Sequence, residues 1–342
     1  MMEATWLQTT WFSLYFVLIA GYAVLDGFDL GVGVLSLFER DPDRRRLYLN
    51  AIAPVWDGNE VWLLTGGGAL FAAFPHVYAT VFSGFYLALM LVLLALIARA
   101  VAIEFRGKVA SAGWRRVWDA SFGVGSLLAA VLFGVAVGNV VRGIPIGADR
   151  EFAGSFIGLL NPFSLLVGLL TLAMFLVQGA HWMAWKTTGE LRNRMGALAA
   201  RAWVAWVLLY AAATVYGFFE APHLFRGTLS KPLFWVLFLA LMGGLVAQPL
   251  AWKAKRFGQA FLGSSSSIAA LIGLGAVGLY PTLVPSSIDP GFSLTAMNAS
   301  SSEKTLTVML VIALIGMPLV LAYTAWIYRH FRGPVVLDEH SY

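Results

Sequence analysis

The chain has 342 residues, of which 59% are hydrophobic and 12% are charged, with a net charge of +5 and a mean hydropathy of +0.77. Soluble domains carry about 45–50% apolar and about 25% charged residues, so this composition excludes a water-soluble globule and predicts a protein of the lipid bilayer. The absence of cysteine excludes disulfides, thiol nucleophiles and thiolate-bound metal clusters.

About nine stretches are apolar and long enough for membrane-spanning helices, which need roughly 20 apolar residues each. In chain order they are predicted at residues 10–37, 50–74, 78–102, 117–140, 156–184, 198–219, 231–251, 262–281 and 306–330. The first stretch is too long for a signal peptide and follows no Lys or Arg, so we expect it to be retained. Together they predict a single all-α transmembrane domain over residues 1–342.

The basic residues alternate between the two sides of the predicted spans. Eighteen Lys and Arg residues, Arg99 among them, are assigned to the ends of odd-numbered spans or the loops after them, and five lie on the other side. Because cytoplasmic loops are enriched in Lys and Arg, the N-terminus is predicted outside and the C-terminus inside a bacterial cytoplasmic membrane. The same rule accounts for the positive net charge, so no nucleic-acid partner is expected.

Acidic residues within the predicted spans mark a candidate functional site, since charges at membrane depth are costly and are functional by default. Asp26 and Asp29 lie one helical turn apart in the first span, and Asp57 and Glu60 have the same spacing in the second. Glu104 follows the third span. All five are predicted towards the cytoplasmic face. An array on one side of the membrane favours proton uptake from the cytoplasm over a path through the whole bilayer.

Other interpretations of these acids stay open. In an inert scaffold they would pair locally, with Arg99, Arg106 or Lys108 as the partner of Glu104. Asp119 is expected to form a solvated interfacial pair with its neighbours Arg115 and Arg116. A secondary transporter also uses intramembrane acids and glycine-broken helices, although its sites lie near the bilayer midplane.

The histidines are poorly placed for a buried heme, which commonly needs His or Met ligands at matching depth. They are predicted at span ends or in loops: His76, His181, His223, His330 and His340. We therefore expect this chain to bind no heme.

Four parts of the sequence resemble subunit II of the cytochrome bd-type quinol oxidases. They are GYAVLDGFDLGVG at residues 21–33, APVWDGNEVWL at 53–63 with GGGALFAAFP at 66–75, FSGFY at 82–86 with EFRGK at 104–108, and YPTLVPSSIDP at 280–290 with the segments at 293–295 and 298–302. The second and fourth parts are the most specific, and the resemblance spans nearly the whole chain.

The resemblance implies a multi-pass subunit of a bacterial inner-membrane respiratory enzyme that oxidises quinol and reduces dioxygen to water. In that family the b-type hemes and heme d belong to subunit I. Subunit II binds no heme and is expected to contain two four-helix bundles plus one peripheral helix. Some members hold a structural quinone, and a small single-helix subunit is a further partner. This chain is therefore expected to lie in membrane lipid beside a heme-bearing subunit I.

The resemblance also implies a proton path. The family's path residues correspond to Asp57 in the WDGN motif, to the nearby Trp62, and to Glu104 and Lys108. Glu104 stands where some members have Asp, and Glu60 where some have Gln. The predicted site contains no group that reacts with substrate and no metal ligand. Its candidate proton-path residues are Asp57, Glu104, Trp62, Lys108, Asp26, Asp29 and Glu60.

Overall fold

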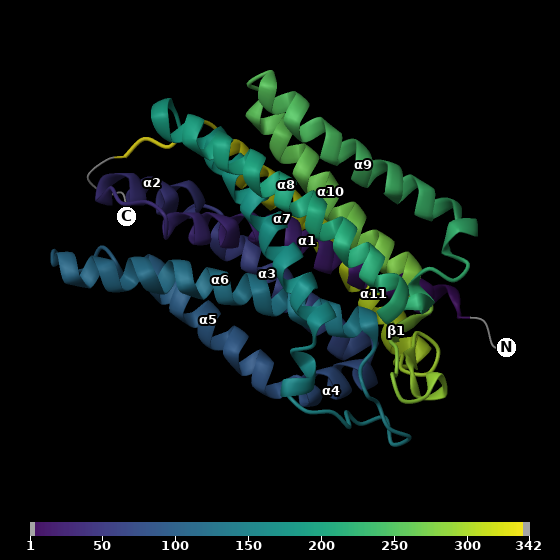
Figure 1. Ribbon diagram of the computed structural model, residues 1–342. Coiled ribbons are helices and arrows are strands. Elements are labelled where there is room, and N and C mark those ends of the chain that lie inside the picture. Colours follow the sequence, from purple (N-terminus) through teal and green to yellow (C-terminus); the bar gives the residue numbers. More distant parts are fainter. Residues whose placement is uncertain (1–3, 338–342) are drawn as a thin grey trace.

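The computed structural model describes residues 4–337, which form a bundle of long helices (Figure 1). The α-helices are α1 (Trp6–Ser36), α2 (Pro42–Ile52), α3 (Trp56–Ala73), α4 (Pro75–Gly84), α5 (Tyr86–Phe105), α6 (Ala112–Arg142), α7 (Pro162–Lys186), α8 (Gly189–Glu220), α9 (Pro232–Lys253), α10 (Phe257–Leu279) and α11 (Glu303–His330). Short 3-10 helices are η1 (Ile157–Leu159), η2 (Pro222–Leu224), η3 (Thr228–Ser230) and η4 (Pro290–Phe292). Strands β1 (Thr282–Val284) and β2 (Leu294–Thr295) pair antiparallel between α10 and α11.

The predicted all-α membrane fold is confirmed. Among the described residues, eight helices are long and apolar enough to cross a membrane, namely α1 and α5 to α11. Helix α1 packs against α3, α6, α7 and α10, α6 also against α5 and α7, α7 against α8, and α9 against α10. Only 6% of the apolar window of α11 is buried within the described residues, so α11 lies at the periphery, while the division into two four-helix bundles stays a prediction.

The second and third predicted spans need correction. Residues 50–74 divide into the end of α2 and the whole of α3, and Pro54, which has no N–H to donate, lies at the break. Helix α3 has 18 residues and carries Asp57, Asn59 and Glu60 in its first turns, so it is not among the eight apolar helices. Residues 78–102 are likewise interrupted at Phe85, between α4 and α5.

Helices α1 and α7 approach each other so closely that only glycine fits at their crossing. A Cβ atom at Gly31 would lie 1.8 Å from the carbonyl oxygen of Phe175. A Cβ at Gly179 would lie 2.6 Å from the carbonyl carbon of Gly31. Because neither contact involves a flexible side chain, a larger residue would push the two backbones apart. The crossing fixes α1, which carries Asp26 and Asp29.

We therefore expect Gly31→Ala to lower the unfolding midpoint of the purified protein. Overpacking costs typically about 1–3 kcal/mol, and a backbone clash belongs at the upper end of that range. Gly243→Ala in α9 is the matched control, because a methyl group there would meet no atom within 4 Å. Thermal unfolding in detergent measures both variants. Equal midpoints would show that the two helices are not held at this distance.

The predicted orientation can be tested with single cysteines, since the chain has none of its own. Asp43 in α2 and Ser287 beyond β1 are both exposed, and α2 and β1 lie at opposite ends of the bundle (Figure 1). A membrane-impermeant maleimide applied to intact spheroplasts is expected to label Ser287→Cys. Asp43→Cys should react only after permeabilisation. The reverse pattern would invert the positive-inside assignment.

Candidate functional site

Three charged residues from α1, α3 and α5 form a buried ionic cluster. Asp26 on α1 and Arg99 on α5 are both 0% exposed. The Nη2 atom of Arg99 lies 2.8 Å from Oδ1 of Asp26, and its Nη1 atom lies 3.8 Å from Oε2 of Glu60 on α3. Removing an ion from water costs several kcal/mol, which only close pairing offsets. Each charge of the cluster therefore depends on the others.

A chain of hydrogen bonds joins Asp29 to the peripheral helix α11. The side-chain amide of Asn59 donates to Oδ2 of Asp29 at 2.8 Å and to the carbonyl of Leu25 at 3.3 Å. The hydroxyl of Tyr328 on α11 donates to Oδ1 of Asn59 at 2.9 Å. Oδ1 of Asp29 has no hydrogen-bond partner among the described residues. Tyr328 thus fixes the orientation in which the Asn59 side-chain amide donates to Asp29.

The predicted site residues divide into a buried and an exposed group. Asp26 and Asp29 are fully buried, Glu60 joins Asp26 through Arg99 with its side chain 23% exposed, and Trp62 is 8% exposed beside Gly21, where a Cβ would lie 2.3 Å from its ring. The exposed group lies on the surface of this chain and consists of Asp57, Glu104 and Lys108.

Helix α3 presents a stripe of polar, glycine and apolar residues that no described residue covers. Its exposed positions recur at helical spacing and comprise Asp57, Gly58, Val61, Leu64, Thr65, Gly68 and Phe71. A Cβ atom built at Gly58 or Gly68 would meet no atom within 4 Å. The stripe therefore has room for another helix to approach closely.

Two expected ion pairs are wrong. Arg99 does not lie in a loop or pair with Glu104; it is buried and pairs with Asp26. Asp119 pairs with Arg45 at 3.0 Å and with Arg106 at 2.5 Å, and its side chain is 13% exposed. The adjacent arginines at 115 and 116 are not its partners. Helix α2 brings Arg45 to Asp119, a contact that sequence proximity could not indicate.

Three residues of the site were missed as functional candidates, namely Arg99, Asn59 and Tyr328. Arg99 could have been found from the sequence, because residue 99 falls within the predicted span 78–102 and a cation at that depth needs a carboxylate partner. Asn59 lies within the WDGN motif. Tyr328 had no local signal, since its partner is 269 residues away.

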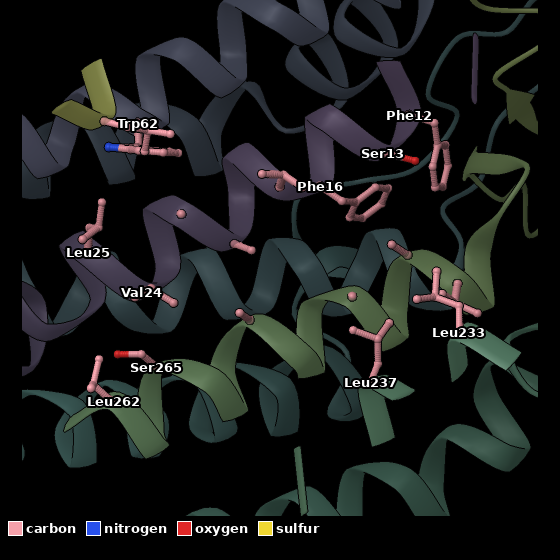
Figure 2. A pocket seen from close by; sticks show the side chains of 18 of the residues that line it. Phe12, Ser13, Phe16, Val24, Leu25, Trp62, Leu233, Leu237, Leu262 and Ser265 are labelled. Atoms are coloured by element: carbon pink, nitrogen blue, oxygen red, sulfur yellow. The ribbon is translucent and has the colours of Figure 1, made fainter. Parts of the chain in front are cut away.

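A long apolar groove of about 980 Å³ runs beside the cluster (Figure 2). Phe16 and Val24 of α1 line one wall, and Leu237 of α9 and Leu262 of α10 line the other. Tyr328 and Trp62 lie at the wall nearest the acids, so the groove and the hydrogen-bond chain share a residue. Its volume lies at the upper end of the about 300–1,000 Å³ usual for ligand pockets.

Two of the histidines are engaged within the chain. His181 is 2% exposed and its Nδ1 atom lies 3.4 Å from the hydroxyl of Ser264. The Nε2 atom of His223 lies 2.9 Å from the carbonyl of Val141. His340 lies outside the described residues. Within residues 4–337, no three His, Asp or Glu side chains are grouped as a metal site would require.

Comparison with known proteins gives a consistent match along the chain. The family model described as cytochrome bd terminal oxidase subunit II matches residues 7–331. Cytochrome bd-I ubiquinol oxidase subunit 2 of Escherichia coli K12 is 37% identical, with 97% of this chain and 96% of that protein covered. Cytochrome bd ubiquinol oxidase subunit 2 of Bacillus subtilis is 36% identical, with 97% and 98% covered.

The fold is also known from a solved structure. A chain of the bd oxidase from Geobacillus thermodenitrificans superposes with a TM-score of 0.80 at 18% sequence identity. The superposition covers 96% of the present chain and 99% of that one.

Proposed function

Because the chain belongs to the cytochrome bd terminal oxidase subunit II family, we propose that it binds a heme-bearing subunit I in the bacterial inner membrane and conducts protons to it from the cytoplasm. The whole complex then oxidises quinol and reduces dioxygen to water. This chain supplies neither heme ligands nor a reacting group. Its contribution is a surface for subunit I and the acids that carry protons towards it.

The exposed stripe of α3 is the observation that carries this proposal. Asp57 in the stripe is exposed, and a carboxylate that faced lipid would be costly. A partner helix lying over Gly58 and Gly68 would cover it, since both glycines leave open space. Asp57 would then lie between the two subunits, where a proton can pass from one to the other.

The remaining acids provide a route by which protons enter from the cytoplasm. Glu104 and Lys108 are exposed near the end of α5, where water and protons are available. We infer that protons pass from there to Asp57; Glu60, one helical turn further along α3, belongs to the ionic cluster through Arg99. Uptake from this side makes oxygen reduction electrogenic.

The apolar groove fits a structural quinone, the second part of the proposal. A quinone has a long apolar tail and two carbonyl oxygens, and the groove is apolar with hydroxyls at Ser265, Thr324 and Tyr328. Lipid extraction of the purified protein tests this. We expect about one quinone per chain in the wild type and much less in Ala269→Trp, which fills the groove. Equal quinone content would contradict the site.

A secondary transporter is the weaker candidate. The family match names an oxidase subunit along residues 7–331. The acids also converge on a single arginine rather than on broken helix ends of the kind that bind transported ions.

The experiment for the proposed function is purification through a tag on this chain. We expect a heme-bearing polypeptide to co-purify, with heme bands in the reduced-minus-oxidised spectrum and quinol-dependent oxygen consumption. Replacing His76 or His223 with Ala should leave all heme bands intact, because the hemes belong to the partner. Loss of a b-heme band in either variant would assign a ligand to this chain.

Tyr328→Phe tests the link between α11 and Asp29. Without the hydroxyl, the Asn59 amide loses the bond that orients its NH2 group towards Asp29. A lost hydrogen bond of about 1 kcal/mol corresponds to roughly a fivefold fall in turnover, together with a changed pH profile. Tyr323→Phe on the same helix, 60% exposed, should behave like the wild type. Identical pH profiles for both variants would remove Asp29 from the proton path.

A further inference from the structure

A second cavity lies at the end of the bundle opposite the β-hairpin. It has a volume of about 290 Å³ and lies where α2, the end of α7 and the segment after α11 meet. Its polar side chains belong to Asn50, Lys186, His330 and Arg332. The segment is held in place because the amide of Val335 donates to the carbonyl of Lys186 at 2.8 Å. This cavity is separate from the groove and from the acid cluster.

The charged side chains that line this cavity are positive and have no carboxylate partner within residues 4–337. Lys186 is 7% exposed; its ammonium donates to the carbonyl of Phe331 and lies 5.0 Å from the ring centre of Trp182. None of the described lining residues is acidic. Among the described residues, neither Lys186 nor Arg332 forms an ion pair with a carboxylate. A nearly buried ammonium with only a carbonyl and a ring as partners is under-compensated.

Four arginines near this end of the bundle have carboxylate partners, whereas Arg192 and Arg256 have none among the described residues. Arg44 pairs with Glu190, and Arg194 with Glu39. Arg45 and Arg106 share Asp119. What sets the cavity apart is that its lysine is nearly buried, and an anion from outside the described residues would compensate it.

We propose that this cavity binds a phosphate group carried by an anionic phospholipid of the cytoplasmic leaflet. Basic pockets between membrane helices on the cytoplasmic side bind such headgroups. Arg332 offers a planar fork of donors and Lys186 a compact charge, a combination suited to phosphate oxygens. Above the cavity, α11 exposes Leu319 and Trp326, which are 68% and 59% exposed, so the acyl chains can lie along an apolar helix.

The test compares lipid-dependent stability of the intact purified complex. We expect phosphatidylglycerol in nanodiscs to raise the unfolding midpoint above the value in phosphatidylcholine. The double variant His330→Gln/Arg332→Gln should lose most of that rise. Arg329→Gln removes an equal charge from the same helix end, but Arg329 does not line the cavity, so this variant should keep the rise. An unchanged rise in the double variant would overturn the proposal.

Two further arms separate the sources of the anion. Inorganic phosphate added in phosphatidylcholine nanodiscs should give no comparable rise in the unfolding midpoint. An equal rise would mean that the ligand is free phosphate and not a lipid. Asp338→Asn/Glu339→Gln neutralises the acids beyond the described residues. An unchanged lipid response in that variant supports the proposal. If instead both this variant and the double variant lose stability equally in phosphatidylcholine nanodiscs, the cavity belongs to the acidic residues at the end of the chain, and the proposal is overturned.

Discussion

Arg99→Gln is expected to prevent assembly of a stable oxidase. The guanidinium is 0% exposed and lies 2.8 Å from Asp26, so its removal leaves a buried carboxylate without a counter-ion. Breaking a buried pair from one side costs about 3–5 kcal/mol, a large share of the stability of most proteins. Glu60 would lose its nearest cation at the same time. The yield of complex purified through a tag on this chain, and its unfolding midpoint, measure the effect.

A second variant separates lost charge balance from lost packing. Asp26→Asn/Arg99→Gln leaves neither partner charged and should recover much of the yield that the single variant loses. Arg142→Gln is the matched control: it breaks a pair with Glu220 whose side chains are 37% and 27% exposed. An exposed pair contributes about 0–1 kcal/mol, so this variant should assemble normally. If the double variant gives no higher yield of complex than Arg99→Gln, the arginine is needed for packing and not for charge balance.

The sequence was a good guide to features that depend on local pattern. Apolar runs located the long helices, because a chain segment that crosses lipid must satisfy its backbone hydrogen bonds internally, as a helix does. The same criterion failed for α3, whose first turns carry Asp57, Asn59 and Glu60 and are too polar to count as a span. It also could not see the interruption at Phe85, which lies inside a continuous predicted span over residues 78–102.

The site was predictable in its acids but not in its pairing. Asp26, Asp29 and Glu60 were found because a carboxylate within an apolar run is conspicuous. Asp26 pairs with Arg99 of α5, 73 residues away, and Asn59, the hydrogen-bond donor to Asp29, accepts from Tyr328 of α11, 269 residues away. Sequence periodicity carries no information at such separations. That Asp57 lies on the surface was not predictable from sequence; it follows from the exposure of Asp57 and from the open space at the neighbouring Gly58.

Asp57→Asn is expected to lower quinol-dependent oxygen consumption by about tenfold or more while heme content stays normal. Asparagine has nearly the shape of aspartate and keeps its hydrogen-bonding capacity, but it cannot take up and release a proton. Positioned proton-transfer groups contribute about 10²–10⁴ in rate, and a partial bypass through water would reduce the loss to about tenfold or more. Oxygen uptake normalised to heme measures the loss.

The controls distinguish a proton carrier from a packing residue. Asp57→Glu keeps a carboxyl group on a longer side chain and should retain more activity than Asp57→Asn. Thr65→Val changes the same exposed stripe of α3 without removing a titratable group and should turn over normally. Lys108→Ala, just beyond the end of α5, should have a smaller effect than Asp57→Asn. A scaffold role for Asp57 gives a different result, either failure to bind subunit I or full activity in a heme-replete complex. Full turnover of heme-replete Asp57→Asn would therefore rule out proton conduction through this residue and leave α3 as a docking surface alone.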